Sequence, residues 1–127
     1  MAIFKRTGRG INACRILVVA LAVICSGLVN ASSTYWCSGQ VNGVYITKDG
    51  DVIINGTFRN DWVRVCNLNN SELGVTTVVC SLWASYVANA LKEKLNIRLM
   101  YAEVDFDGCN NIPTYYAAPI PAYIMLE

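Results

Sequence analysis

The side chains able to do chemistry in this chain are cysteines and closely spaced aspartates, because its 127 residues include no histidine. Without histidine, the Ser-His-Asp and Cys-His nucleophile systems are excluded. Two carboxylate pairs remain, Asp49 with Asp51 and Asp105 with Asp107. Carboxylate pairs at suitable separations hydrolyse glycosidic bonds, but aspartates two residues apart beside a glycine are typical of solvated turns. We therefore expect a protein that binds rather than catalyses, with a small carboxylate-based hydrolase as one alternative.

Asp105 and Asp107 are also the candidates for a calcium site, because carboxylate oxygens are the ligands that this cation prefers. The calcium-loop pattern is incomplete, since Gly108 and Cys109 follow and no glutamate stands at the required distance. The four cysteines from Cys37 onward are spaced by 29, 14 and 29 residues, which fits no zinc motif. Beyond this candidate site we expect no metal and no cofactor.

Aromatic side chains give a clearer indication of function than the acids. Flat rings offer apolar area with a polar edge, so they stack on sugars or anchor a protein partner. Four rings fall outside the predicted core and are the candidate binding residues: Trp36, Trp62, Tyr115 and Tyr116. Trp36 adjoins Cys37 and has packing on a disulfide as its alternative role. Tyr115 and Tyr116 are adjacent, so one of their two rings should point outward.

Four cysteines, Cys37, Cys66, Cys80 and Cys109, are expected to form two disulfides. Four cysteines permit three pairings. We favour Cys66 with Cys80, which closes a short loop and contributes about 3 kcal/mol on the chain-entropy model. The second disulfide then joins Cys37 to Cys109, ties the two ends of the domain and contributes about 4 to 5 kcal/mol. Four free buried thiols are the alternative.

The first 31 residues have the three parts of a secretory signal peptide. Four basic residues and no acid precede Ile16, and the apolar run from Ile16 to Val29 is interrupted only by Ser26 and Gly27. Small residues around Ala31 indicate cleavage after that residue. The apolar run has 14 residues, whereas a membrane-spanning helix needs about 20. We therefore expect a secreted or periplasmic domain over residues 32–127, with no membrane span after cleavage.

The charge of this expected domain differs from that of the whole chain. Residues 1–31 hold four of the ten basic side chains and none of the nine acidic ones, so the net charge changes from +1 to −3. Six scattered basic residues provide no positive stripe along which a phosphate backbone could bind. We expect no nucleic-acid partner. The remaining 96 residues suit a single domain.

The elements that must position these side chains follow from the residue pattern. Residues 41–47 and 52–58 are rich in β-branched residues and flank Asp49-Gly50, which indicates a hairpin, and a third strand covers residues 62–68. A helix of roughly 16 to 18 residues begins at Thr76 or Thr77, with Trp83 and Tyr86 on its core side. Two strands follow over residues 97–102 and 122–126, joined by an irregular connection that ends in a segment rich in tyrosine and proline.

The predicted order is therefore β-β-β-α-β-β, mainly β with one helix and two disulfides. This is the order of an OB-like five-stranded barrel, in which the helix lies between strands three and four. Another small α+β sheet with one helix packed on one face has the same order, so it remains the alternative.

Several short segments share a pattern with known proteins. They are Trp36-Cys37-Ser38-Gly39, Asp49-Gly50, Val65-Cys66-Asn67, Cys80 followed by Trp83, and Cys109 with Ile112-Pro113 before a proline-rich end. In these segments the chain resembles a family of small exported proteobacterial proteins with no established function. The resemblance covers essentially all of residues 32–127.

A second resemblance rests on Cys66 and Cys80, the helix that follows, and Ile97-Arg98-Leu99. In this arrangement the chain is similar to the receptor-binding B subunits of subtilase-type pentameric bacterial toxins. That resemblance implies an OB-fold ring that binds glycans. The sugar-contacting serine motif of those subunits is not recognisable here, so no binding residue is transferred.

Three functions are compatible with the sequence. The first is a secreted or periplasmic binding module, alone or as a homo-oligomer, that recognises a glycan or a protein partner at a cell surface. The second is an envelope structural or inhibitor protein that docks through its tyrosine- and proline-rich segment, residues 114–123. The third is the carboxylate-based hydrolase.

Overall fold

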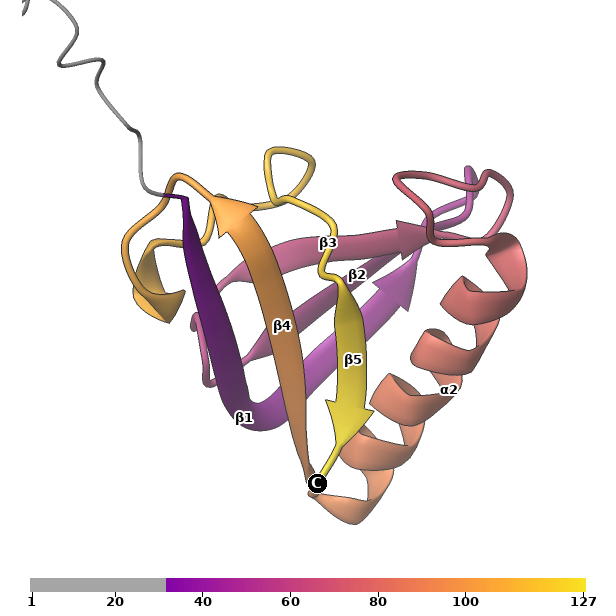
Figure 1. Cartoon of the computed structure of the whole chain (residues 1–127). Coiled ribbons are helices and arrows are strands. Elements are labelled where there is room, and N and C mark those ends of the chain that lie inside the picture. The colour runs from indigo at the N-terminus through magenta and orange to yellow at the C-terminus, as the bar shows by residue number, and fades with distance from the viewer. Residues whose placement is uncertain (1–31) are drawn as a thin grey trace, which may run out of the picture. The chain divides into compact units, whose positions relative to one another are not determined.

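The computed structural model of the chain describes residues 32–127, and the predicted signal peptide over residues 1–31 lies outside the described residues. Five strands and one α-helix follow in the predicted order, with a short 3-10 helix before the last strand (Figure 1). Their bounds are β1 Ser33–Ile46, β2 Asp51–Gly56, β3 Trp62–Asn67, α2 Thr77–Glu93, β4 Asn96–Val104, η1 Cys109–Asn111 and β5 Tyr123–Leu126. Within residues 32–127 no helix is long and apolar enough to cross a membrane.

The strands form one antiparallel sheet in the order β3-β2-β1-β4-β5. β1 belongs to both halves of the sheet. Its N-terminal half pairs with β4 and its C-terminal half pairs with β2, and a register shift separates Val41 from Gly43. Figure 1 shows β1 bending sharply between the two halves. The predicted strand over residues 41–47 is therefore too short. The small and polar residues between Ser33 and Gln40 give no clear strand pattern, yet this segment forms a strand. Its Gly39 packs closely against Thr57 and Phe58.

The strand order is that of the predicted OB-like barrel, but the sheet is not closed. Among the described residues, β3 and β5 share no ladder, and a single parallel bridge joins Val63 to Tyr115 in the segment before β5. The Tyr115 amide donates to the Trp62 carbonyl at 2.8 Å, and the Arg64 amide donates to the Tyr115 carbonyl at 3.2 Å. The connection between β4 and β5 thus reaches the free edge of β3.

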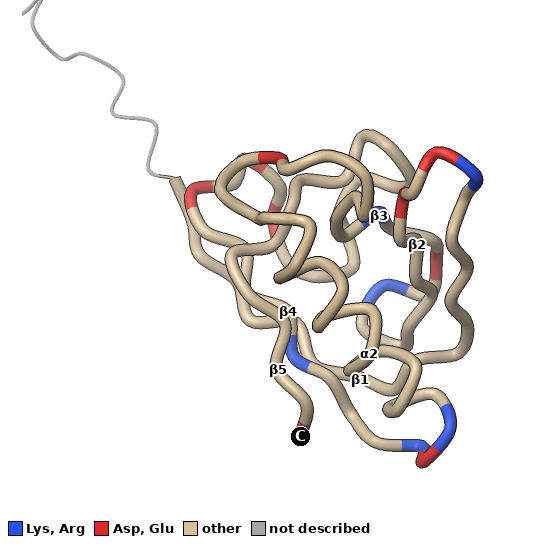
Figure 2. Tube along the Cα trace, turned by 90° about the vertical axis from the view of Figure 1, so that its right-hand side faces the viewer, with Lys and Arg blue, Asp and Glu red and all other residues tan. Residues whose placement is uncertain are grey.

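The helix α2 begins where the sequence predicts, and its 17 residues fall within the predicted length. The Thr76 hydroxyl accepts a hydrogen bond from the Val79 amide, and Lys94 adopts a left-handed conformation after the last turn. Cys80, Trp83, Val87 and Ala90 form the buried stripe, spaced by three and four residues. Tyr86, predicted to face the core, is 41% exposed, because this stripe is only one residue wide on each turn. The outer face of α2 carries no charge before its last turn (Figure 2).

The core lies between α2 and the inner face of the bent sheet. Its fully buried side chains include Val52, Ile97, Leu99 and Tyr101. Both disulfides border it, and their pairing is the predicted one: Cys37 with Cys109 and Cys66 with Cys80. These bonds hold the N-terminal half of β1 to η1 and the end of β3 to the start of α2, which fixes the loops on either side of the open edge.

Candidate functional site

The outer face of β1, β2 and β3 brings together aromatic side chains that are far apart in the sequence. In strand register, Gly43, Asn55 and Trp62 form one row, and Tyr45, Ile53 and Arg64 form the next. Strand alternation places these residues on the face opposite the main core. We call the four rings Tyr45, Trp62, Tyr115 and Tyr116 the aromatic face.

The Trp62 indole lies across the sheet because Gly43 leaves room for it. A Cβ atom added at Gly43 would stand 2.9 Å from Cη2 of Trp62, so the ring reaches from β3 over β2 to β1. There it meets Tyr45 edge to face, with 5.0 Å between the ring centroids and 64° between the planes. Mutual packing therefore fixes the orientation of both rings, and Tyr45 remains 40% exposed.

Ile53 shows that this outer face has a small apolar cluster of its own. Its side chain is 1% exposed, although it does not belong to the main core cluster. Its cross-strand neighbours are Tyr45 and Arg64. Burial on the outer face of a sheet requires a cover, and the aromatic rings and the Arg64 side chain supply it. The aromatic face thus packs on a buried side chain of the sheet, Ile53.

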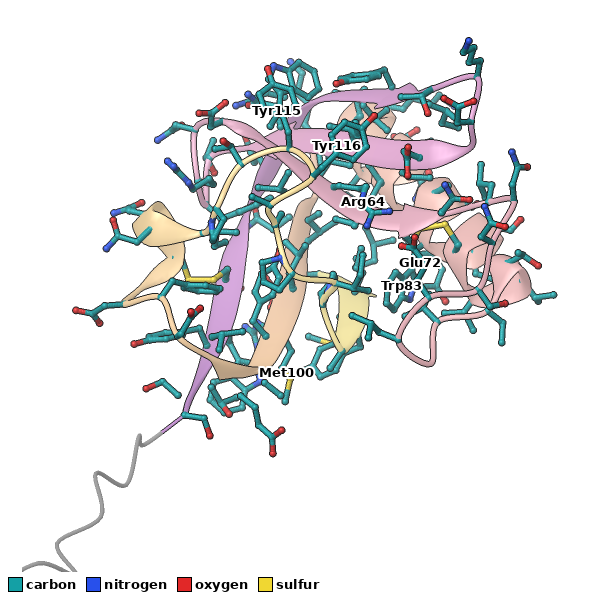
Figure 3. All side chains as sticks on the ribbon, turned by 90° about the horizontal axis from the view of Figure 1, so that it is seen from above. Arg64, Glu72, Trp83, Met100, Tyr115 and Tyr116 are labelled. Atoms are coloured by element: carbon teal, nitrogen blue, oxygen red, sulfur yellow. A yellow bond between two sulfur atoms is a disulfide. The ribbon has the colours of Figure 1, made fainter. Side chains whose placement is uncertain are left out.

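Tyr115 and Tyr116 reach the same place from the connection between β4 and β5. The Tyr115 backbone makes the bridge to β3, and its φ of 51° lies in the left-handed region, which a bulky residue rarely adopts. Tyr116 follows with its ring over the Arg64 guanidinium at 5.8 Å from the ring centroid. Figure 3 shows Tyr116 between Tyr115 and Arg64. Tyr116 is 61% exposed and Tyr115 43%, so both offer ring surface to a ligand.

Arg64 ties this aromatic face to a group of acidic side chains. One of its terminal nitrogens lies 3.0 Å from Oδ1 of Asp51 and 2.7 Å from Oε2 of Glu72. Figure 3 shows Glu72 beside Arg64, on the side away from Tyr115. The Arg64 side chain is largely buried, whereas Glu72 is about one-third exposed. Because two carboxylates hold the same terminal nitrogen of Arg64, the guanidinium is fixed in place beneath the Tyr116 ring.

Asp51 is the centre of the polar network beneath the rings. Its carboxylate accepts hydrogen bonds from Arg64 at 3.0 Å, from Asn67 at 2.9 Å and from the Thr47 hydroxyl at 3.4 Å. Burial alone would raise the pKa of Asp51, but the Asn67 and Arg64 hydrogen bonds and the Arg64 charge outweigh it, so the pKa is lowered. An anion with both oxygens engaged is a structural support, which argues against Asp49 and Asp51 as a hydrolytic pair.

The acidic surroundings extend to the exposed hydroxyl of Tyr116. Desolvation and the negative charge of Asp51 raise the pKa of Tyr116, with Tyr45 and Asp49 adding to the effect. A phenol is protonated at neutral pH even without this shift, so the Tyr116 hydroxyl is available as a hydrogen-bond donor.

Trp36 lies apart from the other predicted binding residues. It stands on the half of β1 that pairs with β4, opposite Met100, and its indole nitrogen donates to the Tyr123 hydroxyl at 3.0 Å. Figure 3 shows Met100 well separated from Tyr115 and Tyr116. Trp36 is 57% exposed, so it offers a ring to solvent on a different surface. Three of the four predicted rings are thus brought together, and Trp36 is not.

Asp105 and Asp107 stand near η1 and do not gather with further ligands. The Asp107 carboxylate accepts a hydrogen bond from the Tyr35 hydroxyl at 3.0 Å. Within residues 32–127 no group of three or more histidine, cysteine or acidic side chains is arranged to hold a metal ion. The structure therefore offers no support for calcium at this pair.

The tyrosine- and proline-rich segment is anchored in the fold. Ile112, just before the segment, and Pro121 within it are fully buried, and Ala118 in its middle is 5% exposed. The Arg59 guanidinium also donates to the Ile112 carbonyl at 2.7 Å. The segment is therefore a fixed border of the aromatic face, which presents Tyr115 and Tyr116 in set positions.

Sequence reasoning missed Tyr45, Arg64 and Glu72 as parts of this site. Tyr45 lies in a predicted strand, and its alternation with Val44 and Ile46 could have placed it on the outer face. Arg64 alternates with Val63 and Val65 in the same way. Glu72 lies in a loop whose position depends on the Cys66–Cys80 disulfide and on its own tight turn with Val75. No local pattern indicates that it meets Arg64.

Comparison of the chain with protein-family models, with curated proteins and with solved structures finds no significant match.

Proposed function

We propose that residues 32–127 form a non-catalytic binding module, secreted or periplasmic, that recognises a glycan through the aromatic face. The observation that carries this proposal is that Tyr45, Trp62 and Tyr116, from two strands and a distant loop, meet on one partly exposed surface. Rings with apolar faces and polar edges suit the stacking of sugars.

The fold supports the same location. OB-type barrels bind oligosaccharides on the face of strands two and three, between the loops that join strands one to two and four to five. Here Trp62 and Arg64 lie on that face, and the loop from β4 to β5 brings Tyr116 to its edge. The two disulfides suit an oxidising compartment, where an exported binding protein would meet cell-surface glycans.

The rigidity of the surface is a further argument. Gly43, the Arg64 ion pairs and the Tyr115 bridge each hold one part of the aromatic face before any ligand arrives. Because little conformational entropy is then lost on binding, a small contact area can produce useful affinity.

The test is binding of the purified, oxidised protein to a panel of immobilised oligosaccharides. Tyr116→Ala is expected to lower affinity for the bound glycan by about tenfold or more, as removal of a central ring does at binding surfaces. Tyr86→Ala is the matched control, since Tyr86 is similarly exposed but lies on α2. Equal effects of the two substitutions, or no glycan bound by the native protein, would contradict the proposal.

A further inference from the structure

The charges around the aromatic face restrict which sugars it can accept. Arg64 is the only cation in contact with the rings among the described residues, and Asp51 and Glu72 both pair with it, at 3.0 and 2.7 Å. Two carboxylates outweigh the single positive charge of the guanidinium that they contact, so the group as a whole gives an anionic ligand no net attraction. The group Arg64, Asp51 and Glu72 carries a net charge of −1.

The neighbouring basic residues do not change this balance. Lys48 stands next to Asp49 on the turn between β1 and β2, where the two opposite charges offset each other. Arg59 donates to the neutral Ile112 carbonyl and keeps its positive charge, but it pairs with neither Asp51 nor Glu72, and Arg98 pairs with Glu127 on the strands β4 and β5. Lys92 and Lys94 lie at the far end of α2. The group of three charged side chains that adjoins the Tyr116 ring thus keeps one uncompensated negative charge.

Two further features favour a positively charged ligand group. The faces of aromatic rings carry partial negative charge and attract cations, and Tyr45 and Tyr116 both leave ring surface exposed. Desolvation and, after it, the negative charge of Asp51 raise the pKa of Tyr116, which is the direction expected of a phenol beside a carboxylate. Rings and carboxylates at one surface are the combination that binds organic ammonium groups.

Resting on the proposed function, we infer that the aromatic face selects sugars that carry a free amino group, accepts uncharged sugars more weakly, and excludes sugars with a carboxylate or sulfate. In this arrangement the sugar ring stacks on an aromatic side chain, and the ammonium group of the sugar faces Glu72. Glu72 is the most exposed side chain of the group Arg64, Asp51 and Glu72.

The experiment compares three oligomers of equal length: glucosamine, N-acetylglucosamine and galacturonic acid. We expect the glucosamine oligomer to bind about fivefold or more tightly than the N-acetylated one, and the galacturonic acid oligomer not to bind. The preference for glucosamine should decrease as salt is added, because the ion pair is partly exposed, whereas binding of the N-acetylated oligomer should not change.

Glu72→Gln tests the role of the charge itself. It should abolish most of the preference for glucosamine over N-acetylglucosamine, measured as the ratio of the two affinities in the same variant, because glutamine keeps the shape of the side chain but not its charge. Glu93→Gln removes the same charge from an exposed position on the last turn of α2 and should leave the preference unchanged.

Two results overturn the inference while leaving the proposed function intact: equal or tighter binding of galacturonic acid, or a glucosamine preference that survives in Glu72→Gln. Failure of all three oligomers to bind, together with failure of the wider panel, removes the proposed function and this inference with it.

Discussion

At the scale of single residues, a few polar atoms hold the aromatic face in place, and Asp51 has the most contacts. It receives hydrogen bonds from Arg64, Asn67 and Thr47, and its own amide donates to the Thr47 hydroxyl. Asn67 in turn accepts from the amides of Asn69 and Asn70. One buried carboxylate therefore links the turn after β1, the strands β2 and β3, and the loop that carries Glu72.

The lowered pKa of Asp51 predicts how stability depends on pH. A carboxyl group whose folded-state pKa lies below its unfolded value stabilises the fold fully above the unfolded value, about 4, and loses that contribution as pH falls through the folded value. Asp51→Asn should cost about 2 kcal/mol at pH 7 and reduce the loss of stability below pH ~4. Urea unfolding between pH 2 and 7 measures both. If Asp51→Asn loses stability below pH ~4 as steeply as the native protein, other carboxylates dominate the loss of stability in acid.

Substitution of Tyr101 should instead raise stability, because its buried hydroxyl has no hydrogen-bond partner among residues 32–127. Burial strongly raises the pKa of Tyr101, so the group stays neutral, but an unsatisfied hydroxyl still destabilises the fold. Tyr101→Phe should raise the free energy of unfolding by about 1 kcal/mol. Tyr35→Phe is the control. The Tyr35 hydroxyl donates to Asp107, so removing it should not raise the free energy of unfolding. Destabilisation of more than 1 kcal/mol by Tyr101→Phe would reveal a partner for the hydroxyl.

At the scale of secondary-structure elements, close approach between strands positions the rings. β1 provides Gly43 and Tyr45, β3 provides Trp62 and Arg64, and the β4–β5 connection adds its two tyrosines. The row from Gly43 to Trp62 allows the indole to reach across β2 to β1, and the next row places Arg64 opposite Ile53. A change of register by one residue would separate these partners.

Gly43→Ala tests this arrangement, because its new methyl group would collide with the Trp62 ring. The indole should turn away from Tyr45, changing the near-ultraviolet circular dichroism, lowering stability by about 1 kcal/mol and weakening glycan binding. Asn42→Ala, at the adjacent exposed position, is the control. An unchanged dichroism spectrum in Gly43→Ala would mean that Trp62 does not depend on the gap at Gly43.

The strands and helix could largely be predicted from the sequence, whereas the composition of the site could not. The Asp49-Gly50 turn, the Thr76 cap and the period of α2 are local signals, and the elements that depend on them lie where expected. Two errors came from non-local packing. The first half of β1 is stabilised by pairing with β4 despite its polar composition, and Tyr86 is exposed because α2 packs through a narrow stripe. The meeting of Glu72 with Arg64 likewise depends on tertiary structure.

At the scale of the whole molecule, the sheet remains open between β3 and β5, and a single bridge at Tyr115 spans part of this opening. The disulfides constrain both sides: Cys66–Cys80 holds the loop with Glu72, and Cys37–Cys109 holds the start of the β4–β5 connection. A small domain buries a limited share of its surface, so such covalent links are an important part of its stability. They also keep the borders of the aromatic face in fixed positions.

The distribution of aromatic residues over the molecule separates three surfaces. Trp36 and Tyr123 lie on the sheet half formed by β1, β4 and β5, Tyr86 lies on the outer face of α2, and the aromatic face occupies β1, β2 and β3. Only the last of these combines more than two rings with partly buried ion pairs among the described residues. The central claim is therefore that ligands bind at the aromatic face and not at the other two surfaces.

The most direct test is to follow the backbone amide chemical shifts of the oxidised protein while a glucosamine oligomer is added. We predict that the largest changes occur at residues 43–45, 53–55, 62–64 and 115–116, with smaller changes around Glu72. Changes confined to the strand region of Trp36 and Tyr123 or to α2 would contradict this account, as would the absence of any change at millimolar oligomer.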